Sequence, residues 1–99
     1  MAIAIEVNFH GAGATLENYI KSLTILGAVP EGPHPAADCL FHWVTQTHHH
    51  HGLRVIDVWR SEAAFDEFVP KVQAAAAQLG MPEPKVKTID VANYLTAGL

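Results

Sequence analysis

Residues 52–68 read GLRVIDVWRSEAAFDEF, and within this stretch the pattern changes from that of a strand to that of a helix. Residues 53–59 are rich in β-branched and aromatic side chains, which favour a strand. Ser61 is placed to cap a helix, and Glu62 and Asp66 suit the positive end of its dipole. Gly80 predicts where this helix ends. Its apolar stripe is Phe65, Phe68, Val69, Val72 and Leu79.

Pro70 interrupts this helical pattern. Because proline has no backbone N–H and its ring meets the carbonyl four residues back, we expect a kink or a break there.

The same two patterns occur upstream. Residues 3–9 alternate strictly between apolar and polar, which predicts a half-buried strand. From residue 15 the period becomes helical, with Thr15 as N-cap and Gly27 as the terminating glycine. The apolar face of this helix is Leu16, Tyr19, Ile20, Leu23 and Leu26.

Residues 40–47 and 85–95 complete the expected strands, so the order is β-α-β-β-α-β. This order predicts one domain over residues 1–99 with an α+β, ferredoxin-like βαββαβ fold. Its four-stranded antiparallel sheet would carry both helices on one face.

Composition excludes several classes of partner. The 99 residues carry a formal net charge of −4, and the six basic residues are scattered, so we expect no nucleic-acid partner. No apolar run approaches the roughly 20 residues that span a bilayer. The N-terminus lacks the basic segment of a signal peptide, which predicts a cytoplasmic protein.

Cys39 is the single cysteine of the sequence, so no internal disulfide forms. We expect it to be a small buried hydrophobe rather than a reactive thiol.

Two helices cover one face of such a sheet and leave the other open. We expect the helices to cover Ile3, Ile5, Val7, Phe9, Phe41, Trp43, Ile56, Val58, Ile89 and Val91. The open face would then hold Glu6, Asn8, His10, His42, Val44, Asp57, Trp59, Thr88, Asp90, Ala92 and Tyr94. This mixture of apolar and a few polar groups is typical of a small-molecule pocket.

Four stretches resemble one family. LFHWV (residues 40–44), GLRVIDVWRSEAAFDEF, LGMPEP (79–84) and VANYL (91–95) are similar to the dimeric α/β-barrel proteins, among them small bacterial relatives of antibiotic-biosynthesis monooxygenases. The resemblance implies a homodimer built across the open sheet faces and a pocket for a small aromatic or polyketide-like ligand. It also implies oxygenation without a cofactor, with Asn8 and Trp59 near the substrate. Relatives often carry histidine where this chain has Ala92, which favours a non-catalytic alternative.

His42 and Asp57 are the strongest candidates for chemistry. An imidazole oriented by a carboxylate acts as a general base near neutral pH, whereas the alternative is a buried histidine that is merely hydrogen-bonded. Glu6, Asp57 and Asp90 form either an acid–base pair or ion pairs with Arg54, Arg60 or Lys85. The expected ligand-binding residues are Tyr19, Glu6, His10, Tyr94 and Ala92. A third hypothesis, haem binding through His10 or His42, has no strong pattern behind it.

Four consecutive histidines, residues 48–51, stand between the two central strands. Neighbouring rings on an extended segment point to opposite faces, so only alternate rings such as His48 and His50 would share an ion. No cysteine or paired carboxylate is near enough in sequence to complete a tetrahedral site. We therefore expect an exposed hairpin tip, remote from the pocket, that binds metal only adventitiously.

Overall fold

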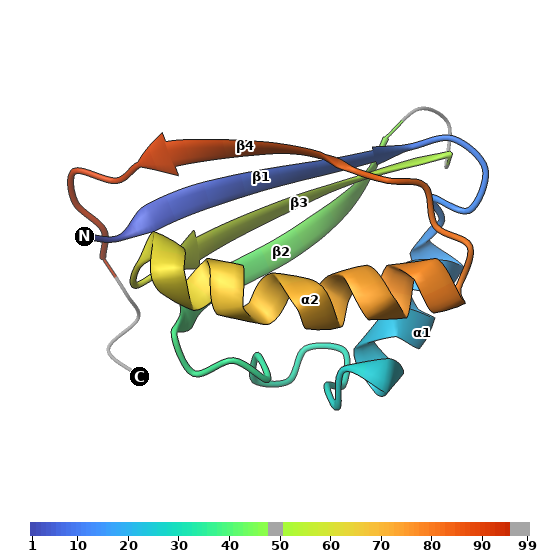
Figure 1. Ribbon diagram of the computed structural model, residues 1–99, viewed down its shortest axis with the longest axis horizontal. Helices are drawn as coiled ribbons and strands as arrows, with labels where there is room; N and C mark the ends of the chain where they lie inside the picture. Colours follow the sequence, from blue (N-terminus) through green and yellow to red (C-terminus); the bar gives the residue numbers. More distant parts are fainter. Residues whose placement is uncertain (48–50, 96–99) are drawn as a thin grey trace.

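The computed structural model describes residues 1–47 and 51–95 (Figure 1). The elements are β1 (Ile3–His10), α1 (Leu16–Ile25), β2 (Cys39–Thr47), β3 (Gly52–Trp59), α2 (Glu62–Gln78) and β4 (Lys85–Asp90). This β-α-β-β-α-β order confirms the predicted fold class. The predictions for His48 and His50 lie outside the described residues.

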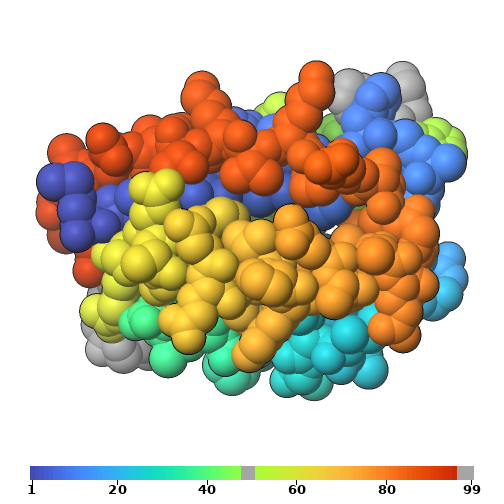
Figure 2. Space-filling model, in the orientation of Figure 1, coloured from blue at the N-terminus to red at the C-terminus, as the bar shows by residue number. Residues whose placement is uncertain are grey.

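The four strands form one antiparallel sheet in the order β2-β3-β1-β4. Both helices lie on the same side of this sheet, α2 along its length and α1 near one end (Figure 1). Figure 2 shows that side, with α2 between β4 and the region of α1. Among the described residues, no helix is long and apolar enough to cross a membrane.

The predicted helix ends are confirmed. The Thr15 hydroxyl accepts from the Asn18 N–H at 3.2 Å, and the Ser61 hydroxyl accepts from the Ala64 N–H at 3.2 Å. Both satisfy backbone donors that the first helical turn leaves unpaired. Past the C-caps, Gly27 and Gly80 adopt φ values of 79° and 68°, where a side chain would be strained.

Two expectations about element boundaries were wrong. Helix α2 continues through Pro70 without a break. The ring of Pro70 is exposed, so the carbonyl that loses its partner lies on the solvent side, while the buried Phe68 and Ala75 hold the helix on the sheet. Strand β4 ends at Asp90 rather than at residue 95, because residues 91–95 have no neighbouring strand to pair with beyond the start of β1.

The assignment of faces was right for β1 and wrong for the other three strands. Ile3 pairs with Trp59 and Ile5 with Asp57, so these β3 residues share the helix-covered face with the apolar side of β1. His42 pairs with Asp57 and joins them there. The open face instead carries Phe41, Trp43, Ile56, Val58 and Ile89.

The faces of these three strands were assigned wrongly because the strands carry apolar residues on both faces. Alternation alone cannot orient such strands, and a β-bulge between Cys39 and Phe41 lets Cys39 and His42 face the same side. Polar side chains are tolerated under the helices because they bond to each other.

The core lies between the sheet and α2. Trp59, Ile5 and Leu53 are its largest fully buried side chains. Phe68 of α2 packs with Trp59 and Ile5, and Leu53 packs in a second cluster with Phe9, Ala14 and Val55. Helix α1 contributes no buried residue, and its Leu16 and Ile20 are each 38% exposed. The apolar face of α1 therefore stands off from the sheet and leaves space beneath it.

Candidate functional site

That space is a cavity of about 620 Å³ between the sheet, both helices and the loop that joins α1 to β2. Its wall is mainly apolar. It includes the predicted inner face of α1, side chains of α2, and the sheet residues Val7, Phe9, Val44 and Val55. A concave apolar space with few polar groups is the usual form of a small-molecule site.

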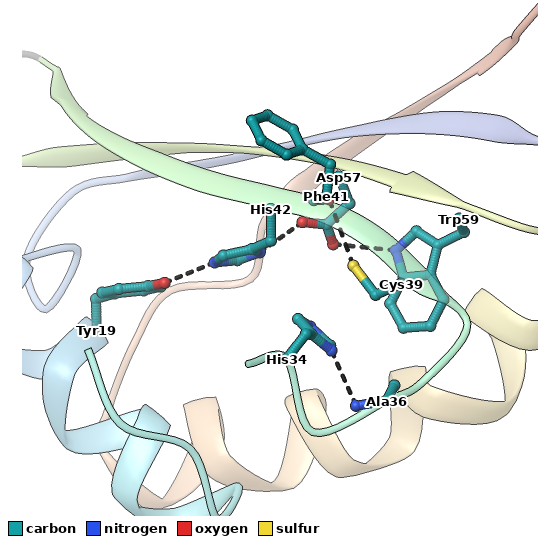
Figure 3. A network of polar contacts seen from close by, with 8 residues as sticks. All are labelled: Tyr19, His34, Ala36, Cys39, Phe41, His42, Asp57 and Trp59. Carbon is teal, nitrogen blue, oxygen red and sulfur yellow. Dashed lines mark hydrogen bonds and ion pairs between the residues drawn. The ribbon is translucent and has the colours of Figure 1, made fainter. Parts of the chain in front are cut away.

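A chain of polar side chains crosses the sheet side of this cavity (Figure 3). His42 Nδ1 lies 2.5 Å from Asp57 Oδ1, and His42 Nε2 lies 2.6 Å from the Tyr19 hydroxyl. Because a carboxylate only accepts hydrogen bonds, the proton of a neutral His42 ring sits on Nδ1. The Tyr19 O–H then donates to Nε2. Asp57 thereby orients the imidazole, and Nε2 is its basic atom.

Asp57 is 6% exposed and uses both carboxylate oxygens. Oδ1 accepts from His42, and Oδ2 accepts from the Trp59 indole N–H at 3.1 Å. A buried carboxylate is tolerated only when such donors surround it. In the described parts of the chain, Arg54 and Arg60 instead pair with Glu6 and Asp38.

Tyr19 remains a phenol over the physiological range. Burial disfavours the charged phenolate, and the negative charge of Asp57 disfavours it further, which together raise the pKa of Tyr19 to about 12. Its hydroxyl therefore donates to His42 and keeps oxygen lone pairs with which it accepts from a ligand.

His34, which sequence reasoning missed, also lines the cavity. Its Nδ1 accepts from the Ala36 N–H at 2.9 Å. The ring packs edge-on against Trp59, with centroids 5.4 Å apart, and lies 5.2 Å from the ring of Phe68. Burial is the main cause that lowers the pKa of His34, so the ring is neutral near pH 7. The PHP triplet at residues 33–35 was the available signal, because two prolines stiffen the backbone that holds this ring.

Cys39 lies in the core, and its Sγ donates to the Phe41 carbonyl at 3.4 Å. Burial, followed by the charge of Asp57, raises the pKa of this thiol to about 12. The thiolate is the reactive form of cysteine, so Cys39 is the inert buried residue that the sequence predicted.

The structure brings together Tyr19, His42, Asp57 and Trp59 and separates them from the other candidates. Glu6, Asn8 and His10 lie on the open face or at its edge, away from the cavity. Arg54 bonds there to Glu6 at 3.2 Å and to Asn8 at 3.3 Å. Because β3 presents Trp59 to the helix side, Asn8 and Trp59 lie on opposite faces of the sheet, and their contact with one substrate stays a prediction.

Tyr94 and Ala92 follow β4 and are exposed. They line a shallow depression with the N-terminal residues, and neither lines the cavity. The structure therefore does not bring them together with Tyr19, and their contact with the same ligand stays a prediction.

In the part of the chain that the structure describes, no three acidic, histidine or cysteine side chains converge as a metal site. His42 would have to release Tyr19 or Asp57 before either ring nitrogen met an iron. The arrangement is therefore better suited to proton transfer than to axial haem ligation.

By sequence, the chain matches no known family model and no curated protein. Solved structures do match. SnoaB, a cofactor-independent oxygenase from Streptomyces nogalater, has a TM-score of 0.64 at 15% identity, over 95% of this chain and 96% of that one. A proposed antibiotic-biosynthesis monooxygenase from Chloroflexus aurantiacus has a TM-score of 0.61 at 19% identity, over 95% and 97%.

A protein of unknown function from Nitrosomonas europaea has a TM-score of 0.70 at 15% identity, over 98% of this chain and 96% of that one. These matches cover nearly the full length of every chain, so the likeness concerns the whole domain. At such identities they show the architecture. The chain has the ferredoxin-like fold found in SnoaB and in other proteins similar to antibiotic-biosynthesis monooxygenases.

Proposed function

We propose that the cavity binds an aromatic or polyketide-like molecule and that the Tyr19–His42–Asp57 chain removes a proton from it. The observation that carries this proposal is the position of the chain: three hydrogen-bonded groups, with the base His42 between the other two, lie in the wall of a mainly apolar cavity. A proton acceptor in the wall of an apolar pocket suits abstraction from a phenol or from carbon activated by a carbonyl.

The proton follows the hydrogen bonds. A ligand hydroxyl, or a CH₂ group activated by a carbonyl as in anthrone, gives a proton to the Tyr19 oxygen while the Tyr19 proton moves to His42 Nε2. The imidazolium that forms is stabilised by the Asp57 carboxylate at Nδ1. Tyr19 ends the step as it began, as a neutral phenol, and the ligand carries the negative charge.

The reaction that this step allows is oxygenation without a cofactor. The deprotonated ligand reacts through carbon with O₂, and the new C–O bond gives a peroxide that takes up the proton. The O–O bond then breaks as a second proton leaves the same carbon, which forms a carbonyl group and releases water. Overall a CH₂ group and O₂ give C=O and H₂O, so no external reductant is needed. SnoaB, which shares the fold, is a cofactor-independent oxygenase.

Oxygen uptake with anthrone tests the proposal. We expect anthrone-dependent uptake by the native protein, and a loss of at least about a hundredfold in Tyr19→Phe and His42→Gln, the lower end of general acid–base effects. Glu17→Gln, an exposed change on the same helix as Tyr19, is the matched control. Equal rates in native protein and in both relay variants would contradict the proposed proton path.

A binding protein without turnover is the competing function, and it is favoured by Ala92, a position where the family resemblance implies that relatives often carry histidine. The two are separated by measuring binding and uptake together. Saturable anthrone binding in the absence of oxygen, with no uptake when oxygen is admitted, would establish the non-catalytic alternative.

We also propose that the protein is a homodimer joined through the open face of the sheet. The register of the strands arranges the side chains of this face in rows that run across the sheet. One row is wholly apolar: Phe41, Val58, Ala4 and Ile89. The next contains Trp43 and Ile56 beside Glu6 and Lys87, and the third is polar: Thr45, Arg54, Asn8 and Lys85.

Phe41 is 59% exposed and Trp43 is 42% exposed, which is unusual for large side chains on adjacent rows of one sheet. A second copy, turned about a two-fold axis, would cover the apolar rows of each with those of the other. We expect Phe41→Lys to give a monomer by sedimentation, whereas Ile25→Lys, at an exposed apolar position on α1, should leave the dimer intact. A native monomer at micromolar concentration would overturn this proposal.

A further inference from the structure

We infer that His34 donates a hydrogen bond to a carbonyl oxygen of the bound molecule, so that the site selects hydroxy-carbonyl compounds over simple phenols. This inference rests on the proposed function, because it names a second recognition group in the same cavity. It assigns a role to a residue outside the Tyr19–His42–Asp57 chain.

The first observation is the tautomer of His34. Nδ1 accepts from the Ala36 N–H at 2.9 Å, so in the neutral ring the proton is on Nε2. Nε2 is therefore a donor. Since burial lowers the pKa of the ring, this donor is neutral at pH 7 and suits a neutral acceptor such as a carbonyl rather than a carboxylate.

The second observation is that no acceptor among the described residues is bonded to this donor, although the side chain lines the cavity. In the same part of the chain no fully buried side-chain nitrogen or oxygen lacks a partner, so the unpartnered Nε2 keeps some exposed surface. Every other side-chain donor on the helix side of the cavity wall is already bonded within the protein. These donors are Tyr19, Ser22, Cys39, His42 and Trp59.

The third observation is that His34 is held in place. Its ring packs against Trp59, Phe68 and His42, with centroids 5.4, 5.2 and 5.5 Å away. Pro33 and Pro35 restrict the backbone on both sides. A donor fixed before binding loses little entropy when the ligand arrives.

Together these observations set two polar positions in one apolar space. The Tyr19 hydroxyl accepts a proton from the ligand, and His34 Nε2 donates to the ligand, on either side of the His42 ring (Figure 3). A ligand that satisfies both carries an acidic hydroxyl and a carbonyl on one aromatic framework. A carbonyl held by His34 would also withdraw charge from the anion that proton removal creates.

Three matched probes test the inference: meta-hydroxybenzophenone, meta-benzylphenol, which has methylene in place of the carbonyl, and benzophenone, which lacks the hydroxyl. Binding is measured by calorimetry on the native protein and on His34→Phe, which keeps an aromatic ring but loses the donor. We expect His34→Phe to weaken meta-hydroxybenzophenone about tenfold and to change meta-benzylphenol by less than about twofold. His34→Gln, which retains a neutral N–H donor, should recover part of the loss.

Equal weakening of both phenols in His34→Phe would overturn the role of His34 while leaving the proposed site intact. Failure of all three probes to bind the native protein would overturn the proposed function and this inference with it. If His34→Phe does not fold, the native protein still decides: it must bind meta-hydroxybenzophenone more tightly than meta-benzylphenol. The NMR signal of the His34 Nε2 proton must also shift with the ketone and not with the methylene compound.

Discussion

Two substitutions of Asp57, to alanine and to asparagine, should separate its effect on the stability of the fold from its effect on His42 as a base. The reason is that alanine and asparagine leave different hydrogen-bond patterns. Asp57→Ala removes the acceptor for two donors, His42 Nδ1–H and Trp59 Nε1–H. A buried donor left without a partner costs about 1–3 kcal/mol, so the expected loss for two donors is about 2–6 kcal/mol. In a domain of this size that lowers Tm by roughly 10–45 °C.

Asp57→Asn should be much milder. Its amide oxygen accepts from Trp59, and its NH₂ group donates to Nδ1 once His42 moves its proton to Nε2. Nε2–H then donates to the Tyr19 oxygen, and the Tyr19 O–H has to turn away from His42 toward the cavity. The remaining cost is the loss of charge-assisted bonds, about 1 kcal/mol. The tautomer has been inverted, however, so Nε2 no longer accepts a proton and anthrone-dependent oxygen uptake should disappear.

The assay is urea unfolding at one protomer concentration, followed by tryptophan fluorescence, with the His42 tautomer read from ring ¹⁵N shifts. Asp38→Asn is the matched control, because that carboxylate is 57% exposed and its pairing with Arg60 is a surface contact. It should change stability by less than about 0.5 kcal/mol. If Asp57→Asn is as unstable as Asp57→Ala, or if His42 keeps its proton on Nδ1, the account of the hydrogen-bond chain is refuted.

Two further predictions concern stability alone. The pKa of Cys39 is raised from 9.0 and that of Tyr19 from 10.0, each to about 12, so both groups hold their protons more tightly in the folded state. The stabilisation that these two pKa shifts give the fold is complete below the reference values of 9.0 and 10.0 and is lost as pH rises toward about 12. Urea midpoints should therefore fall over that pH range, and they should fall less steeply in Cys39→Ser. A urea midpoint that does not change with pH would contradict this prediction. Pro70→Ala should stabilise by about 2 kcal/mol, because it restores a helical bond at some cost in unfolded-chain entropy. Pro30→Ala should instead destabilise slightly, since Pro30 stands in the turn closed by Gly32 N–H and the Val29 carbonyl; a thermal melt in which both changes act alike would refute the assignment.

The element order could be predicted because each element has its own local signal. Period-two alternation in β1, caps at Thr15 and Ser61, and glycines after both helices all act over a few residues. The break predicted at Pro70 does not occur, because the prediction considered only the local effect of proline on the helical backbone. The packing of Phe68 and Ala75 outweighs one missing backbone bond.

The faces could not be predicted because register is not a local property. In β3, apolar residues occupy both parities: Leu53 and Val55 on one side, Ile56 and Val58 on the other. A one-residue choice therefore moves Asp57 and Trp59 from one face to the other, and either choice leaves apolar residues on both faces of the strand. The link between His42 and Asp57 survived the error, because both residues were assigned to one face and the structure keeps them together on the other.

The wrong face assigned to His42 and Asp57 changes which residues surround them. With His42 and Asp57 on an open face, their surroundings would depend on a partner subunit. Under the helices, the same residues meet Tyr19 of α1, and His34 enters from the following loop within one chain. Helix α1 buries no residue, so the domain forgoes apolar contact that a close-packed helix would supply. A ligand that fills this space would supply that contact, and its binding would stabilise the fold in proportion to its affinity. The cavity that weakens the core is thus the feature through which a bound molecule would reach the Tyr19–His42–Asp57 chain.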